Sequence, residues 1–251
     1  MTTTPTKSTS SGTMSHDVAM KLAETEIERM IDVVDQLSPR HWSLPTDCEE
    51  WDVKALLSHQ LGAMEGNASL REFVRQYLVA TKKSKRSGRP LVDEMTAGQV
   101  SDLASLSPVE LANRLRSKAQ ASVRGRRRIP ALMRSLPIKP GAPFDGTWKL
   151  GYLVDTIMNR DFWMHRVDLT RATGLEMVLT SEHDGVIVDD VVNEWARAHG
   201  QQFKLVLAGV AGGTFAQGQR GEEIRLDAVE FCRVLSGRGH GSGLLSQKIP
   251  F

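Results

Sequence analysis

Hydrophobic residues recur at intervals of three and four through the first two thirds of the chain. Between residues 17 and 37 they form one stripe, made up of Ala23, Ile27, Met30, Ile31, Val34 and Leu37. This spacing places side chains on one face of an α-helix. Related patterns predict three more long helices, at residues 52–70, 108–136 and 151–174. We therefore expect a helical bundle over residues 16–175, preceded by a disordered tail at residues 1–15 that has almost no apolar side chains.

The pattern changes after Gly174, which stands where a helix would end. A short amphipathic helix is predicted at about residues 181–200. Residues 203–218 and 222–228 then have the character of strands separated by glycine turns. Asp227 is a suitable N-cap for one further helix. Residues 176–251 therefore predict a small α+β domain.

Charge and composition narrow the class of protein. The 251 residues are 40% hydrophobic and 25% charged, an ordinary globular balance, and the formal net charge is only +2. Two distant cysteines, Cys48 and Cys232, do not suggest a disulfide framework, and the sequence shows no apolar run as long as a membrane span. We expect a cytoplasmic protein without a nucleic-acid or membrane partner.

Two basic groups qualify that expectation. Residues 82–89 belong to the run TKKSKRSGRP, which its glycine and proline predict to be a solvated loop. The second group is predicted to lie on the solvated face of a helix and contains Arg124, Arg126, Arg127 and Arg128. A phosphate or nucleic-acid patch is the alternative for both, but no aromatic residues are interleaved with the charges.

Three ionisable residues are predicted to face the bundle interior. Asp161 and His165 lie four positions apart, so that one helical turn stacks their side chains on the same face. His59 lies on the helix at 52–70, on a face with small and apolar neighbours. A buried charge needs a partner. A metal ion bound by all three residues is one explanation, while an Asp–His hydrogen bond and a core histidine are the simpler alternative.

Two blocks of this sequence resemble the signatures of a known family. They are WSLPTDCEEWDVKALLSHQLG, at residues 42–62, and GYLVDTIMNRDFWMHRVDLTRATG, at residues 151–174. Both resemble the mycothiol-dependent maleylpyruvate isomerase family, within the DinB-like metalloprotein superfamily, and the segment from GGTF to Arg238 resembles its C-terminal domain. The resemblance implies a mainly α fold, with a DinB-like four-helix bundle followed by a small sterol-carrier-like α+β domain.

The resemblance also implies a site and a chemistry. The family holds a divalent metal, usually zinc, in a His plus Glu-x-x-x-His site, which corresponds here to His59, Asp161 and His165. Asp161 stands where the family usually has Glu and is one methylene shorter, so the metal would lie closer to this helix or bind through water. The cosubstrate is the thiol mycothiol, and an arginine of the C-terminal domain contributes to activity, for which Arg238 is the best match. The chain would then be an isomerase or S-transferase acting on a small electrophile, as a monomer or homodimer.

Other interpretations of the same residues remain open. The chain could be a non-enzymatic protein that binds a metal and a small apolar ligand, or a metal-dependent hydrolase in which water is the nucleophile. Asp168, one turn beyond His165, could accept a hydrogen bond from a ligand imidazole, or could be a surface or capping residue. Cys48 could be a soft ligand or a reactive thiol, although a small buried side chain is favoured.

Overall fold

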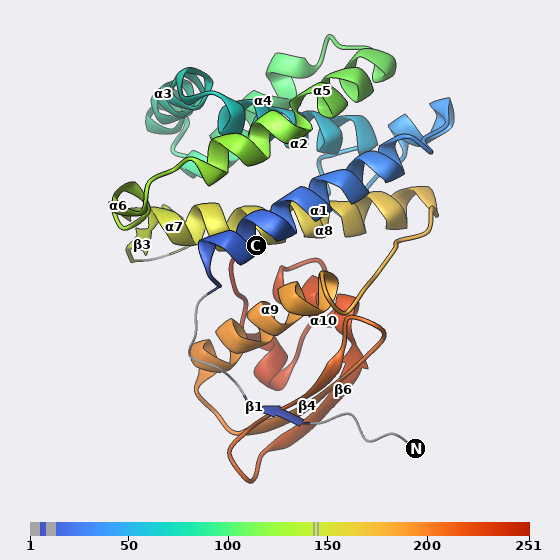
Figure 1. Cartoon of the computed structure of the whole chain (residues 1–251), viewed down its shortest axis with the longest axis vertical. Coiled ribbons are helices and arrows are strands. Elements are labelled where there is room, and N and C mark those ends of the chain that lie inside the picture. The colour runs from blue at the N-terminus through green and yellow to red at the C-terminus, as the bar shows by residue number, and fades with distance from the viewer. Residues whose placement is uncertain (1–5, 9–13, 143, 145) are drawn as a thin grey trace. The chain divides into compact units, whose positions relative to one another are not determined.

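The structure of the chain is a computed structural model (Figure 1) that describes residues 6–8, 14–142, 144 and 146–251. It divides into two compact units. One comprises Ser15–Glu176, and the other comprises Met177–Phe251 together with the N-terminal residues up to Met14. The prediction of a mainly α fold with a small α+β part is confirmed. Among the described helices, none is long and apolar enough to cross a membrane.

The larger unit is built on four helices whose apolar stripes face one another. They are α1 (His16–Val34), α2 (Val53–Ala68), α5 (Pro108–Arg127) and α8 (Met158–Thr173). Their contacts run α1 to α5, α5 to α2, and both α1 and α2 to α8. Two further helices, α3 (Leu70–Ser87) and α4 (Leu91–Leu103), pack against each other and against α2. The buried core includes residues from α1, α2, α5 and α8, among them Ile27, Leu57, Leu115 and Phe162.

Local sequence explains where these helices begin and end. The Asp52 carboxylate caps α2 by accepting a hydrogen bond from the backbone N–H of Ala55 at 2.8 Å, as predicted. Ser107 and Glu110 form a capping box at the start of α5. Gly174 has φ of 71°, a left-handed conformation that suits glycine, and it ends α8.

The last of the four helices does not begin as one regular α-helix. Before α8 the chain forms a short β2–β3 ladder (Pro137–Ile138 with Trp148–Lys149), one turn of α-helix, α7 (Leu150–Tyr152), and a π-helical turn at Leu153–Ile157. A π-turn leaves backbone groups out of the regular ladder. The guanidinium of Arg126 donates to the Val154 carbonyl oxygen in this turn and to Asn159 Oδ1 at 2.9 Å. The sequence predicted one long helix at residues 151–174, and the chain is helical from Leu150 to Thr173, with a π-turn that the pattern did not indicate.

Both predictions for the basic groups need correction. Residues 82–87 continue α3, and the helix ends at Gly88. The loop prediction was wrong because lysine and arginine are good helix formers and the glycine stands at the C-cap. In the second group, Arg126 is buried rather than solvated, because its side chain satisfies the carbonyl of the π-turn. Two shorter elements, η1 (Pro39–Ser43) and α6 (Ala131–Arg134), also belong to this unit.

The smaller unit contains a mixed sheet with strand order β1-β5-β4-β6. β4 (Phe203–Ala208) is antiparallel to β5 (Gly213–Gln217) and parallel to β6 (Glu222–Asp227). Trp195 of α9 (Asp184–His199) packs against Phe203 of β4 and Phe231 of α10 (Ala228–Leu235), with ring centroids 4.7 and 5.3 Å apart. A short η3 turn, Gly243–Ser246, lies near the end of the chain.

The N-terminal tail contributes a strand to this sheet. β1 (Thr6–Ser8) pairs in parallel with β5. The expected disorder is therefore wrong for these residues, because pairing along an edge strand uses backbone groups and needs no apolar side chains. At the other end of the predicted tail, Ser15 is the N-cap of α1 and accepts a hydrogen bond from the backbone N–H of Val18. Residues 1–5 and 9–13 lie outside the described residues.

Candidate metal centre

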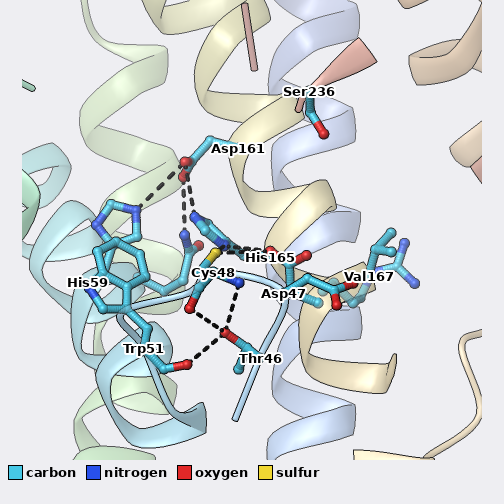
Figure 2. Close-up of polar contacts among 12 residues, drawn as sticks. Thr46, Asp47, Cys48, Trp51, His59, Asp161, His165, Val167 and Ser236 are labelled. Carbon is cyan, nitrogen blue, oxygen red and sulfur yellow. Dashed lines mark hydrogen bonds and ion pairs between the residues drawn. The ribbon is translucent and has the colours of Figure 1, made fainter. Parts of the chain in front are cut away.

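The bundle brings the three predicted ligand residues together (Figure 2). α2 carries His59, and successive turns of α8 carry Asp161 and His165. Asp161 Oδ1 lies 3.6 Å from His59 Nε2 and 3.3 Å from His165 Nε2. One ligand atom from each residue lies within 4.8 Å of the other two. Both imidazoles are buried, while the Asp161 side chain is 28% exposed, so the cluster meets solvent on the carboxylate side.

Each of these side chains is held by a further polar contact on its outer side. His59 Nδ1 is 2.7 Å from Gln99 Oε1, and His165 Nδ1 is 3.1 Å from Asp168 Oδ2. Gln60 Nε2 donates to Asp161 Oδ2 at 3.0 Å. Nδ1 of each imidazole therefore has an acceptor next to it, and Nε2 is the nitrogen that faces Asp161 Oδ1.

This arrangement is chemically suited to a divalent cation. A neutral histidine that donates from Nδ1 has only a lone pair at Nε2. Two such lone pairs and a carboxylate oxygen would repel one another unless a cation or an added proton stood between them. Imidazole nitrogen and carboxylate oxygen are common zinc ligands. The amide oxygen of Gln60, which adjoins Asp161, is also a buried acceptor without a hydrogen-bond partner in the described part of the chain.

The pKa shifts of the protein without a cation also indicate that the centre favours a positive charge. Burial alone would raise the pKa of Asp161, but the charges of His165 and His59 outweigh it and hold this pKa well below its ordinary value. Burial lowers the pKa of His165, whereas the Asp161 carboxylate and the hydrogen bonds to Asp161 and Asp168 raise it well above its ordinary value. A proton on His165 thus takes the place that a metal cation would fill.

The loop before α2 covers one side of the centre. The ring of Trp51 lies 5.0 Å from that of His59 and 5.9 Å from that of His165, between ring centroids. The thiol of Cys48 donates to Asp168 Oδ2 at 3.5 Å and lies 3.9 Å from His165 Nδ1. Thr46 anchors this loop by donating to the Trp51 carbonyl oxygen at 2.8 Å. Cys48 is half-buried and beside the centre, rather than a small hydrophobic residue in the core.

The sequence found some of these residues and missed others. Asp168 is fully buried and bonded to His165, so of its predicted roles the structure favours the outer acceptor over a surface position. Gln60 and Gln99 were missed, since a glutamine on an amphipathic helix carries no signal of its own. Arg238 follows α10 in the smaller unit, where its backbone oxygen accepts from Arg233 Nη2 at 3.3 Å, and its catalytic role stays a prediction.

Solved structures share this fold. Two crystal structures, one of the mycothiol-dependent maleylpyruvate isomerase and one of a histidine-to-alanine mutant of that enzyme, each match with a TM-score of 0.58 and 15% sequence identity. Each match covers 90% of this chain and 90% of the other. No curated protein matches the chain.

A family model gives the classification. The model described as the mycothiol maleylpyruvate isomerase N-terminal domain matches residues 23–170, which is more than half of the chain. The matched region contains all three residues of the candidate metal centre. The chain therefore belongs to the family defined by the mycothiol maleylpyruvate isomerase N-terminal domain.

Proposed function

We propose that this chain is a metal-dependent enzyme that uses mycothiol as its thiol cosubstrate and acts on a small electrophile as an isomerase or S-transferase. The observation that carries the proposal is the convergence of His59 Nε2, His165 Nε2 and Asp161 Oδ1 on one position. The mycothiol and the reaction class are taken from the family and from the enzymes that share the fold.

His59, Asp161 and His165 would hold the metal, for which zinc fits the nitrogen and oxygen ligands. When bound, the metal would supply the positive charge that stabilises the thiolate form of the cosubstrate. Three protein ligands are the number found in catalytic zinc sites, which keep one position for a further ligand, whereas structural sites use four.

The residues of the chain have separate tasks in this proposal. Gln60 holds Asp161 Oδ2, which leaves Oδ1 to face the two imidazoles. Asp168 and Gln99 hold the outer nitrogens of the histidines. Trp51 lies against both rings and covers that side of the centre. The exposed side of Asp161 is the side on which a thiol and an electrophile can approach.

The reaction follows from thiolate chemistry. The sulfur of a thiolate adds to an activated carbon–carbon double bond, and the carbon–carbon bond becomes single and can rotate. Expulsion of the thiolate then restores the double bond with the other geometry, so that the thiol is not consumed. If the adduct is instead protonated and released, the thiol is consumed and the enzyme is an S-transferase.

Metal analysis of three variants tests the site. The purified protein should contain about one zinc per chain, and His59→Ala and His165→Ala should each lose it, because two remaining ligands bind zinc weakly. His240→Ala is the control, since this histidine is exposed in the smaller unit. Zinc near one per chain in both ligand variants would show that the site is wrongly assigned.

Thiol specificity tests the reaction. Turnover of maleylpyruvate and related activated alkenes should require mycothiol, and it should fall when glutathione replaces mycothiol as the thiol. Product analysis separates the two outcomes, because an isomerase regenerates mycothiol whereas an S-transferase releases a thioether. Equal turnover without any thiol would argue against the proposal and favour a hydrolase or lyase.

A further inference from the structure

We infer that Gln99, held in place by Gln76, is a positioning residue that fixes His59 in the tautomer with its proton on Nδ1. The inference rests on the proposed metal site, because it assigns to Gln99 the task of keeping His59 Nε2 free for the metal. It goes beyond the ligand set by making α3 and α4, which lie outside the four-helix core, part of the centre.

A chain of buried amides leads away from His59. His59 Nδ1 lies 2.7 Å from Gln99 Oε1, and Gln99 Nε2 donates to Gln76 Oε1 at 2.9 Å. Gln76 Nε2 donates in turn to the carbonyl oxygen of Gly62 and to Glu72 Oε1, both at 3.0 Å. Gln76 and Gln99 are both buried, so water does not offer an alternative partner.

These hydrogen bonds form a relay from His59 through Gln99 and Gln76 to Gly62 and Glu72. The groups at its far end, Gly62 and Glu72, determine which partner donates in every bond of the relay. A backbone carbonyl and an ionised carboxylate can only accept. Glu72 is ionised, since the hydrogen bond from Arg75 lowers its pKa below the ordinary value. Gln76 must therefore turn its NH₂ group toward Gly62 and Glu72 and its oxygen toward Gln99.

The same reasoning then reaches the histidine. Gln99 must donate to the oxygen of Gln76, so its own oxygen faces His59. An oxygen opposite Nδ1 requires that Nδ1 carry the proton. In neutral His59 the lone pair is then on Nε2, which is the nitrogen facing Asp161. In a reversed relay, the NH₂ group of Gln99 would face His59 and favour a lone pair on Nδ1, leaving Nε2 protonated and unable to bind a metal.

Gly62 explains how Gln99 comes close enough. A Cβ atom at position 62 would lie 2.6 Å from both Cβ and Cγ of Gln99, which real structures do not tolerate. α4 can therefore approach α2 closely only because residue 62 has no side chain. Gly62 thus has two roles in the relay. Its missing side chain leaves space for Gln99, and its carbonyl oxygen accepts a hydrogen bond from Gln76.

Four variants test the inference. Gln99→Met removes the acceptor at similar size, Gln99→Glu retains an acceptor, and Gln76→Met breaks the relay without touching His59. Gln120→Met is the control, because Gln120 is exposed on α5. The first readout is the His59 tautomer, measured by long-range ¹H–¹⁵N correlation of the ring in the zinc-free protein. The second is zinc affinity, measured by competition with a chromophoric chelator.

We expect Gln99→Met to convert His59 to a mixture of tautomers and to weaken zinc binding by roughly 10- to 100-fold, the usual effect of losing an outer partner of a metal ligand. Gln76→Met should also give a mixture, with a smaller loss of affinity. Gln99→Glu should keep the proton on Nδ1, and Gln120→Met should match the unmodified protein. A mere packing role would lower thermal stability in Gln99→Met without changing the tautomer.

The result that overturns the inference is a His59 proton that stays on Nδ1 in both Gln99→Met and Gln76→Met, with unchanged zinc affinity. If the unmodified protein binds no zinc, the proposed function fails instead. The tautomer measurement on the zinc-free protein then still decides whether Gln99 positions His59, so the two failures can be told apart.

Discussion

Replacing Asp168 with alanine should weaken zinc binding without unfolding the bundle. Asp168 is fully buried, and its Oδ2 atom accepts from His165 Nδ1 at 3.1 Å and from the Cys48 thiol at 3.5 Å. Without this carboxylate, the Nδ1–H group of His165 loses its acceptor in a buried position. Leaving a buried donor unsatisfied costs about 1–3 kcal/mol.

Most of that cost should fall on the zinc-bound state. In the zinc-free variant the imidazole can release its Nδ1 proton, keep the proton on Nε2, and donate to Asp161 Oδ1 only 3.3 Å away. A metal-bound imidazole cannot do so, because Nε2 is the ligand atom. A difference of about 1–3 kcal/mol corresponds to roughly 5- to 150-fold in Kd. This range includes the roughly 10- to 100-fold loss commonly found when an outer partner of a metal ligand is removed.

Chelator competition titrations measure this difference directly. Asp168→Asn should lie between the unmodified protein and Asp168→Ala, since an amide oxygen still accepts but a neutral hydrogen bond is about half as strong. Cys48→Ala is the matched control, because it removes another donor to the same carboxylate and should change zinc affinity little. The reasoning is refuted if Asp168→Ala binds zinc as tightly as the unmodified protein while His165→Ala does not bind it.

Three further outcomes are expected. Asp161→Glu restores the usual carboxylate of the family and should retain zinc by metal analysis, with an altered affinity in chelator competition. Loss of both the metal and the soluble protein would instead indicate that Asp161 has a packing role. Thermal unfolding of the zinc-free protein across pH should show two losses of stability. The contribution of His165 is fully present below its ordinary pKa of 6.5 and is lost as pH rises through the raised value. The contribution of Asp161 to stability is present above its ordinary pKa of 3.8 and is lost as pH falls through the lowered value. Asp161→Asn should remove both of these losses of stability. Arg238→Lys should keep zinc and lower turnover in steady-state kinetics, because lysine lacks the fork that holds a carboxylate; full turnover would exclude that role.

Local rules explain why much of the bundle could be predicted. The helical repeat is set by the backbone, so a stripe at intervals of three and four identifies α1 whatever it packs against. The cap at Asp52 and the stop at Gly174 depend only on neighbouring residues. For the same reason, the four-residue spacing already put Asp161 and His165 on one face, and the structure places their side chains 3.3 Å apart.

The same local reasoning failed where a neighbour in space decided the outcome. Arg126 was assigned to a solvated face, but a carbonyl in the π-turn of a distant segment gives it a buried acceptor. A strand at Thr6–Ser8 exists only because β5 offers an edge.

The metal centre shows both kinds of information side by side. The sequence determined which residue types were available on α2 and α8, and which of them share a face. Only the tertiary structure decided that Gln99, 40 positions from His59, lies against its Nδ1 atom, and that Gln60, 101 positions from Asp161, holds its carboxylate. A helical period is fixed by bonds within one segment, whereas a hydrogen bond between helices depends on how closely they pack, and here that distance was set by a missing side chain at Gly62.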